Sequence, residues 1–371
     1  MKLKIALLPG DGIGPEVLAE GVKCLLAIEE AFGHEFIFTE GLIGGIAIEK
    51  TGIPLPEETI ALCKDSDAVL YGAIGDPKYD VPGEHIRPEQ ALFQLRQELG
   101  LFANVRPVQL FPTLVNKSPL KKEVIQGTDF IIYRELSSGI YLGDKTTNKD
   151  GTEASDLCKY TEQEISRITH LAFKAAKGRR KKVSLIDKAN VLESSRLWRK
   201  VVSKIAESYP DITLEYLYMG NATMQMILNP SAFDIILTEN MFGDIISDQS
   251  GVIGGSIGLL PSASIGDEYA MFEPIHGSFP QAKGKNIANP IAAILSSAML
   301  VQHFGLEEEA QTMVAAINKT MKKRIVTPDV NPKSKYSTSQ VGDAIASAIM
   351  DIDENISLND ENIGLGKSTI I

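Results

Sequence analysis

The sequence predicts an α/β protein with a mainly open sheet, and three observations lead to this class. Short apolar runs typical of strands alternate with longer segments of helical periodicity along most of the chain. The chain has 371 residues. A single hydrophobic core usually supports a shorter chain than this, so the length favours two domains. Its composition, 44% hydrophobic and 23% charged, is that of a globular protein and argues against disorder, collagen or coiled coil.

The first expected element is a strand that runs into a glycine-rich turn. The segment KIALL at residues 4–8 precedes PGDGIGPEV and then a helix that reaches about Glu30. Further short apolar runs predict strands at residues 36–39, 68–71, 130–134, 183–187, 214–218 and 233–238. Longer amphipathic segments predict helices at residues 161–177, 192–209 and 290–304. The polar, less regular residues 133–151 are expected to form a projecting arm.

Charge and cysteine content limit the classes of partner. The net charge of −11 argues against nucleic acid or an anionic membrane as the main partner. The three cysteines lie far apart without a C-x-x-C pair, which predicts neither a disulfide framework nor a thiolate metal site. The apolar run at residues 4–8 is too short for a signal peptide, and no apolar stretch reaches 18 residues. We therefore expect a cytoplasmic protein with no membrane association.

The glycine cluster at residues 10–14 (GDGIG) invites comparison with dinucleotide-binding loops. Its spacing is G-x-G-x-G followed by Pro15, not G-x-G-x-x-G, and no acidic residue closes a strand about twenty residues later. Pro15 suits the first turn of a helix. A tight strand-to-helix turn is therefore as good an interpretation as a cofactor loop.

Three arginines stand at expected ends of elements. Arg96 and Arg106 are ten residues apart, and Arg134 closes the apolar run FIIYR. The guanidinium fork binds carboxylates through two parallel hydrogen bonds, so three such groups would suit a small dicarboxylate. The alternative is that each arginine is an ordinary surface cation.

Two aspartates in TENMFGDIISDQS have the spacing of a metal site. Asp244 and Asp248 lie at i and i+4, which on a helix places both carboxylates on one face, where like charges repel unless a cation lies between them. Hard oxygen donors of this kind suit Mg²⁺ or Mn²⁺. An acidic solvated face is the alternative, although Phe242, Ile245 and Ile246 indicate that the helix is largely buried.

Other residues have the chemistry of acid–base or nucleoside binding. Lys188 follows the apolar strand VSLID, and partial desolvation there would lower its pKa enough for it to act as a base. Tyr141 in SSGIYLG offers a phenol for proton donation. The loop that holds His276, Gly277 and Asn289 is long enough to wrap an adenosine group, although taken alone it is only an irregular loop before a helix.

Together these segments resemble the isocitrate/isopropylmalate family of β-decarboxylating dehydrogenases, and most closely its isopropylmalate branch. The resemblance covers residues 7–349, nearly the whole chain. It rests on blocks that occur in one order, namely LLPGDGIGPEV, LFANVRP, YRELSSGIYLG, DKANVLE, TENMFGDIISD, GLLPSASIG and EPIHGS with IANP.

The resemblance implies a homodimer of two-domain subunits with shared active sites. It implies an isopropylmalate/isocitrate dehydrogenase-like α/β fold with an open, mostly parallel sheet that is not a Rossmann fold. A discontinuous cofactor-side domain would comprise residues 1–101 and 255–350, and residues 102–254 would form the substrate, metal and dimerisation domain. Residues 351–371 would be a polar acidic tail.

The resemblance also implies an activity and its site. This is the metal-dependent oxidative decarboxylation of (2R,3S)-3-isopropylmalate to 4-methyl-2-oxopentanoate with reduction of NAD, a step of leucine biosynthesis. Asp244 and Asp248 would bind Mg²⁺ or Mn²⁺, Tyr141 would protonate the enolate, and Lys188 would act across the dimer. Substrate contacts would come from Arg96, Arg106, Arg134, Leu92 and Phe93. Cofactor contacts would come from Ile13, Glu89, His276, Gly277, Gln281 and Asn289, with residues 76–89 near the nicotinamide.

Three positions depart from the family pattern. Gly220 stands where the third metal carboxylate is usual, which predicts weaker metal binding and slower turnover. Gln281 replaces an acid that would repel a 2′-phosphate, so NADP is not excluded. Phe93 replaces a common leucine and would reshape the alkyl pocket. Two alternatives therefore stay open: a dehydrogenase of a related 3-substituted malate, tartrate or isocitrate, and a catalytically weakened regulatory subunit of the same fold.

Overall fold

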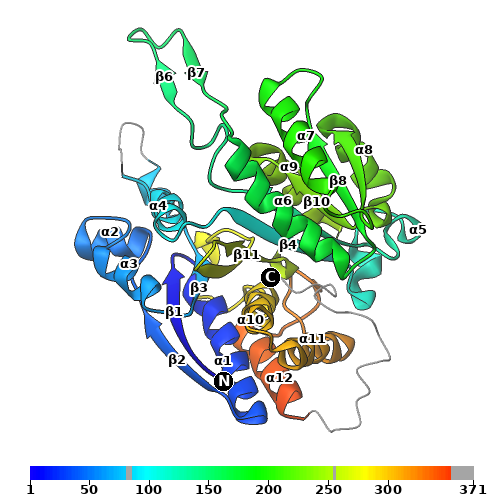
Figure 1. Ribbon diagram of the computed structural model, residues 1–371. Helices are drawn as coiled ribbons and strands as arrows, with labels where there is room; N and C mark the ends of the chain where they lie inside the picture. The colour runs from blue at the N-terminus through cyan, green and yellow to red at the C-terminus, as the bar shows by residue number, and fades with distance from the viewer. Residues whose placement is uncertain (81–85, 254–255, 352–371) are drawn as a thin grey trace. The chain divides into compact units, whose positions relative to one another are not determined.

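The computed structural model describes residues 1–80, 86–253 and 256–351, and these fall into two compact units (Figure 1). The first unit holds residues 1–80, 86–101, 111–117 and 256–351, and the second holds residues 102–110 and 118–253. Each unit contains five strands of a sheet that is mostly parallel. The predicted α/β class with an open, mostly parallel sheet is confirmed. No helix in the described part of the chain is long and apolar enough to cross a membrane.

The strands of the first unit follow the order β2-β1-β3-β12-β11. Neighbouring strands pair in parallel except β11 and β12, which are antiparallel. The central strand β3 is buried along its whole length, as parallel strands covered on both faces are. The strands are β1 (Lys2–Gly10), β2 (Glu35–Glu40), β3 (Ala68–Ala73), β11 (Pro261–Ile265) and β12 (Ala270–Pro274).

Four long helices of this unit pack on one another, and two of them also pack on its strands (Figure 1). The helix α10 lies against β11 and β12, and all its residues except His303 are buried. The long helices are α1 (Gly14–Phe32), α10 (Ile291–His303), α11 (Glu307–Lys322) and α12 (Thr338–Met350). The shorter ones are α2 (Gly45–Thr51), α3 (Glu57–Lys64), α4 (Gln90–Glu98) and the 3₁₀ turns η1 (Pro77–Tyr79), η2 (Pro112–Lys117), η4 (Ile257–Leu259) and η5 (Pro280–Ala282).

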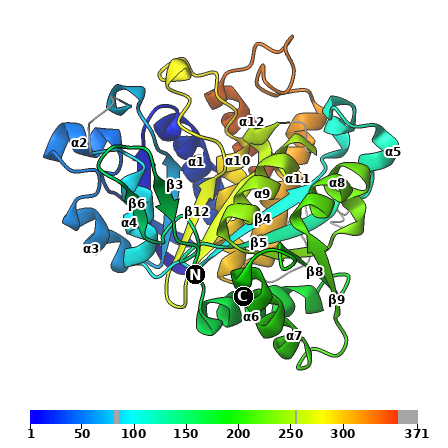
Figure 2. The ribbon, with the colours of Figure 1, turned by 90° about the horizontal axis from the view of Figure 1, so that it is seen from above.

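The second unit has the strand order β4-β5-β10-β8-β9, with β4 antiparallel to β5 and the other pairs parallel. Figure 2 labels β4, β5, β8 and β9 of this unit. These strands are β4 (Ala103–Gln109), β5 (Asp129–Glu135), β8 (Lys182–Asp187), β9 (Thr213–Tyr218) and β10 (Ile235–Thr238). The helices are α5 (Lys122–Ile125), α6 (Glu162–Lys177), α7 (Glu193–Ala206), α8 (Met219–Leu228) and α9 (Asn240–Ile253), with the 3₁₀ turn η3 (Pro230–Ala232). Helix α9 contacts β4, β5 and β10, and α6 packs against α7.

A two-stranded ribbon, β6 (Lys145–Thr147) with β7 (Ala154–Asp156), extends from the second unit (Figure 1). All six of its strand residues are exposed. The predicted arm is therefore present, but its expected start at Tyr133 is wrong. Tyr133 is only 1% exposed because it lies inside β5, where its apolar neighbours continue the strand.

The helices predicted from the sequence agree with the structure to within a few residues, whereas several strands were not predicted. Strand β4 is almost wholly buried although Asn104 and Arg106 interrupt its apolar pattern. Strand β11 consists of small residues, including Ser262 and Ser264, that carry little hydrophobic signal. The expected burial of Ile245 is wrong, because its side chain is 49% exposed on the outer face of α9.

Candidate active site

One face of the strand pair β4–β5 carries two arginines and an asparagine. The register sets Asn104 opposite Arg134, and Arg106 follows two residues later on the same side of β4. Helix α9 covers this face, and Gly243 permits the close approach, because a Cβ there would lie 2.5 Å from Cγ of Arg134. The local sequence thus places both guanidinium groups beneath the first turns of α9.

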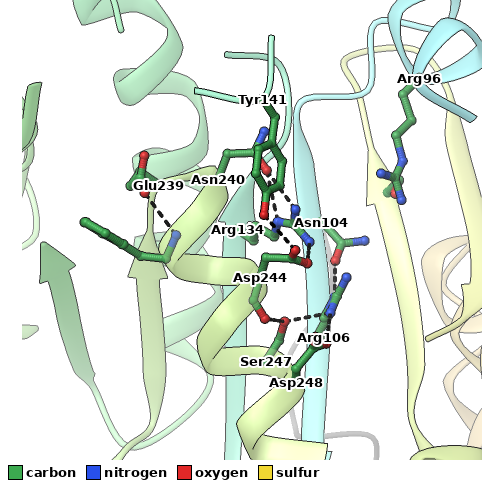
Figure 3. Close-up of polar contacts among 12 residues, drawn as sticks. Arg96, Asn104, Arg106, Arg134, Tyr141, Glu239, Asn240, Asp244, Ser247 and Asp248 are labelled. Carbon is green, nitrogen blue, oxygen red and sulfur yellow. Dashed lines mark hydrogen bonds and ion pairs between the residues drawn. The ribbon is translucent and has the colours of Figure 1, made fainter. Parts of the chain in front are cut away.

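All three guanidinium nitrogens of Arg134 bond to two residues of α9 (Figure 3). Its Nε and Nη2 donate to Oδ1 of Asn240 over 3.1 and 2.9 Å, and its Nη1 pairs with Oδ1 of Asp244. The side chain is 6% exposed. A buried arginine with charge-assisted partners has a fixed orientation, so the interpretation of Arg134 as a surface cation is wrong.

Arg106 lies next along the same face and is nearly as buried, with a side chain 10% exposed. Its Nε donates to Asn104 over 2.5 Å and its Nη1 to the hydroxyl of Ser247 over 2.6 Å. Oδ1 of Asp248 lies 3.8 Å from the same Nη1. Arg106 is therefore not a surface cation either.

Tyr141 reaches the same group from the turn at residues 139–143. Its hydroxyl donates to Oδ2 of Asp244 over 2.9 Å, and the guanidinium carbon of Arg134 lies 5.7 Å from the centre of its ring. Burial, and then the hydrogen bond to Asp244, raises the pKa of the phenol above its ordinary value. The tyrosine is therefore held in its protonated, donating form.

The two aspartates lie one helical turn apart on α9 and differ in exposure. The carboxylate of Asp244 is 35% exposed and bonded, whereas that of Asp248 is 67% exposed. Burial, and then the negative charge of Asp244, raises the pKa of Asp248, against the opposing effect of the two arginines. Among the described residues no group of three or more acidic, histidine or cysteine side chains has the arrangement of a metal site.

The structure brings five predicted residues of the second unit together, but not Lys188 or Gly220. Lys188 follows β8, is half-buried, and its backbone N–H donates to Ser195 over 3.1 Å. No hydrogen bond or ion pair joins its side chain to Asp244 in the part of the chain the structure describes. Gly220 is exposed near the start of α8, where an added Cβ would meet no atom within 4 Å.

In the first unit, helix α4 carries three of the predicted substrate residues. Leu92, Phe93 and Arg96 share one side of the helix because they are three and four residues apart. Phe93 is 48% exposed, whereas the side chain of Arg96 is 14% exposed and donates to Oε1 of Glu273 over 2.7 Å. Arg96 is therefore a cation held by a charged partner, as the other two are, although it is only half-buried.

The glycine-rich turn joins β1 to α1 and is packed against the loop after β12. Ile13 donates its N–H to the carbonyl of Ser278 over 2.8 Å, and a Cβ at Gly12 would lie 2.0 Å from that oxygen. The turn is therefore the tight strand-to-helix connection. A Cβ on Gly75 would lie 2.9 Å from Oε1 of Glu89, which places a third predicted cofactor segment nearby.

The loop with His276, Gly277, Gln281 and Asn289 lies on the same unit. Nε2 of His276 is buried and has no hydrogen-bond partner among the described residues, and burial lowers the pKa of its ring. Gly277 and Gln281 are exposed. Asn289 donates to Oδ2 of Asp329 over 3.0 Å, which orients the amide. The unsatisfied ring nitrogen is a site for a polar ligand atom.

Sequence reasoning missed the neutral residues that orient the charged ones. Asn240 and Ser247 lie four residues before and three after Asp244, on its own helix face, and Asn104 lies two residues before Arg106 on its strand. These spacings were available as a signal. Asp11 was also missed: its buried carboxylate accepts backbone N–H groups of residues 45, 46 and 75 and so orders three loops.

The chain matches the family model for isocitrate/isopropylmalate dehydrogenase over residues 4–345. It belongs to that family. The predicted membership is thereby confirmed, and the protein is a dehydrogenase. It is 50% identical over 350 residues to a 3-isopropylmalate dehydrogenase of Aquifex aeolicus, covering 93% of this chain and 96% of that one. It is 49% identical over 357 residues to a Bacillus subtilis protein of the same name, covering 94% and 98%.

Solved structures of the family have the same fold. An isocitrate dehydrogenase of Methylococcus capsulatus superposes with a TM-score of 0.84 at 34% identity and covers 94% of this chain and 99% of its own. A β-decarboxylating dehydrogenase of Thermococcus kodakarensis gives 0.77 at 35% identity and covers 94% and 96%.

Proposed function

We propose that the protein oxidises and decarboxylates (2R,3S)-3-isopropylmalate to 4-methyl-2-oxopentanoate, with reduction of NAD, as a cytoplasmic step of leucine biosynthesis. The observation that carries the proposal is the convergence of Arg106, Arg134, Tyr141 and Asp244 at one helix face. Two buried cations beside a protonated phenol suit a dianionic substrate that needs a proton donor. The relatives named 3-isopropylmalate dehydrogenase favour this substrate over tartrate or isocitrate.

The arginines hold the carboxylates of the malate. Arg106 and Arg134 have little freedom to reorient, so ligand binding costs little side-chain entropy. Arg96 provides a third cation, and Leu92 and Phe93 beside it offer apolar surface for the 3-substituent. Because the ring of Phe93 is exposed, a change at this position should alter which size of 3-substituent the enzyme prefers more than any other property of the substrate.

Asp244 and Asp248 suit a divalent metal. Two carboxylates one turn apart repel each other, and after burial this repulsion is the second cause of the raised pKa of Asp248; a cation between them relieves it. When bound, Mg²⁺ or Mn²⁺ supplies the positive charge that draws electrons from the oxidised carbon. With two carboxylates and Gly220 in the third position, we expect weaker binding than a complete site gives.

Two side chains move the protons. Lys188 would take the proton of the substrate hydroxyl, directly or through water, and NAD would supply the hydride acceptor. Tyr141 returns a proton to the carbon that loses CO₂, because a phenol is protonated at neutral pH and burial and Asp244 raise its pKa further. Asp244 orients this phenol through the bond of 2.9 Å.

NAD is bound by the first unit. His276, Gly277, Gln281 and Asn289 take the adenosine half, and the unsatisfied Nε2 of His276 is available to it. Ile13 and Glu89 line the segments that approach the rest of the cofactor. Gln281 bonds a ribose hydroxyl without repelling phosphate, so preference for NAD over NADP is modest.

We also propose a homodimer, with α8 and α9 as the surface between copies. Apolar side chains repeat at helical spacing on the outer faces of both helices: Met224, Ile227, Leu228, Ile245 and Val252, which are 46–66% exposed. Exposed apolar stripes of this kind are normally buried in an interface. Sedimentation of the wild type and of Ile245→Lys should give a dimer and a monomer, respectively; a monomeric wild type contradicts the proposal.

The dimer explains how Lys188 acts. In its own chain, the Lys188 side chain bonds none of the residues gathered around Asp244. We therefore place it in the active site of the second copy. Mixing inactive Lys188→Ala with inactive Asp244→Asn then yields hybrid dimers in which one site is fully wild type. Activity should return on mixing. If Lys188 acted within its own chain, both sites of each hybrid would remain defective and no activity would return.

The function is tested by steady-state assay with Mn²⁺ and either NAD or NADP. Isopropylmalate should be turned over with a higher kcat/KM than tartrate or isocitrate. If tartrate or isocitrate gave the higher kcat/KM, that compound would be assigned as the substrate in place of isopropylmalate. No turnover of any of the three at saturating metal would favour a regulatory subunit of the same fold.

A further inference from the structure

One buried tyrosine is not part of the group formed by Arg106, Arg134, Tyr141 and the two aspartates. It contacts both the turn that carries Tyr141 and the helix α9 that carries Asp244. Tyr160 lies just before α6, is 6% exposed, and is not among the residues expected to touch substrate, metal or cofactor. Its hydroxyl donates to Oε2 of Glu239 over 3.1 Å and accepts the N–H of Asn240 over 3.0 Å. Both partners lie at the start of α9.

The hydroxyl completes the cap of α9. The first N–H groups of a helix have no partner within it, and those of a buried helix must be satisfied by other groups. Tyr160 accepts the first of these from Asn240, and Oε1 of Glu239 accepts the N–H of Phe242 over 3.0 Å. Burial raises the pKa of both Glu239 and Tyr160, so the donor keeps its proton.

The same hydroxyl lies directly beneath the turn that carries Tyr141. Gly139 has a φ of +84°, and a Cβ on it would lie 2.1 Å from the Tyr160 oxygen, so only glycine permits this approach. The N–H of Gly139 donates to the carbonyl of Lys159 over 3.1 Å, and the carbonyl of Gly139 accepts the N–H of Gly143 over 3.0 Å. The turn that carries Tyr141 is therefore packed against the Tyr160 hydroxyl and bonded to the backbone just before it.

We propose that Tyr160 is a positioning residue that sets the register between the turn bearing Tyr141 and the helix bearing Asp244, and so aligns the proton donor for the reaction. The inference rests on the proposed function for the role of Tyr141. The path is short: Tyr160 fixes Asn240, whose Oδ1 holds Arg134 and whose helix presents Asp244. A shift of about 1 Å at a reacting centre can cost a hundredfold in rate.

The test is Tyr160→Phe, which removes one oxygen and keeps the ring. The matched control is Tyr209→Phe: Tyr209 is also buried in this unit, and its hydroxyl bonds His170 over 3.0 Å away from the Asp244 group. Trp198, the sole tryptophan of the chain, packs edge-on against Tyr160 with ring centres 5.5 Å apart. Its emission reports whether the ring of Tyr160 has moved.

For Tyr160→Phe we expect unchanged Trp198 emission and a kcat for isopropylmalate lower by about tenfold to a hundredfold. The KM for NAD should stay as in wild type, since the expected NAD residues lie in the other unit. Tyr209→Phe should keep full kcat. If Tyr160→Phe also keeps kcat within twofold of the control, the inference is overturned. A loss of kcat accompanied by a shifted Trp198 emission would equally count against it, because the ring itself would then have been displaced.

Two further arms separate this inference from the proposed function. If Tyr160→Phe does not fold, Glu239→Gln changes the same contact from the other side and should lower kcat in the same direction; unchanged kcat overturns the inference. If the wild type turns over no isopropylmalate, the proposed function fails. The positioning claim is then decided by a crystal structure of Tyr160→Phe, in which the hydrogen bond between Tyr141 and Asp244 should be broken or lengthened, and an unchanged bond refutes it.

Discussion

The hydroxyl of Tyr141 donates to Oδ2 of Asp244 over 2.9 Å, while Arg134 holds the other oxygen of the same carboxylate. One carboxylate thus orients both a cation for substrate and a phenol for proton donation. This arrangement ties the expected metal ligand to the expected proton donor, so a change at Asp244 alters both.

Tyr141→Phe should lower kcat by about a hundredfold or more, because it removes a positioned proton donor. The KM for isopropylmalate should change little, since Arg106 and Arg134 keep their own partners. Because burial and Asp244 raise the pKa of Tyr141 above its ordinary value, the wild-type kcat should show no loss from this group as pH rises to about 9, one unit below the value of an ordinary phenol. Steady-state rates across that range test both statements; a variant within threefold of wild type would remove Tyr141 from the reaction.

The residues that were predictable are those whose signal is local. The pair Asp244 and Asp248 follows from helical spacing alone, and Arg134 from its place at the end of an apolar strand. The strand-to-helix turn at residues 10–14 follows from glycine and proline chemistry, and the structure has it there.

The remaining features depend on contacts between segments distant in the sequence. Tyr141 and Asp244 are 103 residues apart, and their contact requires β5 and β10 to pair so that α9 covers the turn. Whether Ile245 is exposed likewise depends on which side of α9 packs against the sheet. Periodicity marks an apolar side chain but does not say whether its neighbour is the core or another surface.

The pH dependence of stability should carry a contribution from Glu135. This residue is fully buried, and burial raises the pKa of its carboxyl from 4.5 to about 7. Between these values the folded chain keeps a proton that the unfolded chain has released, so the free energy of unfolding falls as pH rises. This loss is on the order of 3 kcal/mol.

Glu135→Gln removes this titration. Relative to wild type, the variant should therefore gain stability on going from about pH 5 to about pH 8. Urea unfolding at both pH values measures this difference in stability between the variant and the wild type. Glu20 is a second buried glutamate with a raised pKa, and Glu135→Gln leaves it in place. The pH dependence that Glu20 contributes is therefore the same in both proteins and serves as the control. An identical pH dependence in variant and wild type would show that Glu135 does not titrate there.

Gln281→Asp should strengthen the preference for NAD. The side chain is exposed on the cofactor loop, so the new carboxylate would stay charged and repel a 2′-phosphate. We expect the ratio of kcat/KM for NAD to that for NADP to rise about tenfold or more. Gln281→Asn shortens the side chain without adding charge and should leave the ratio nearly unchanged; an equal effect of both variants would mean that charge does not govern the selection.

Gly220→Asp should restore a third carboxylate. An added Cβ meets no atom within 4 Å, and the position lies in the first turn of α8, where the helix dipole favours a negative charge. Gly220→Ala supplies the control, because it adds a Cβ and gains about 0.5–1 kcal/mol of helix propensity over glycine without adding an oxygen. If α8 of one copy faces α9 of the other, only the aspartate should tighten Mn²⁺ binding, by about tenfold, and raise kcat. Titration calorimetry with Mn²⁺ measures the first effect independently of turnover. Equal Mn²⁺ affinities in the aspartate and alanine variants would place residue 220 away from the metal, which Asp244 and Asp248 alone would then bind.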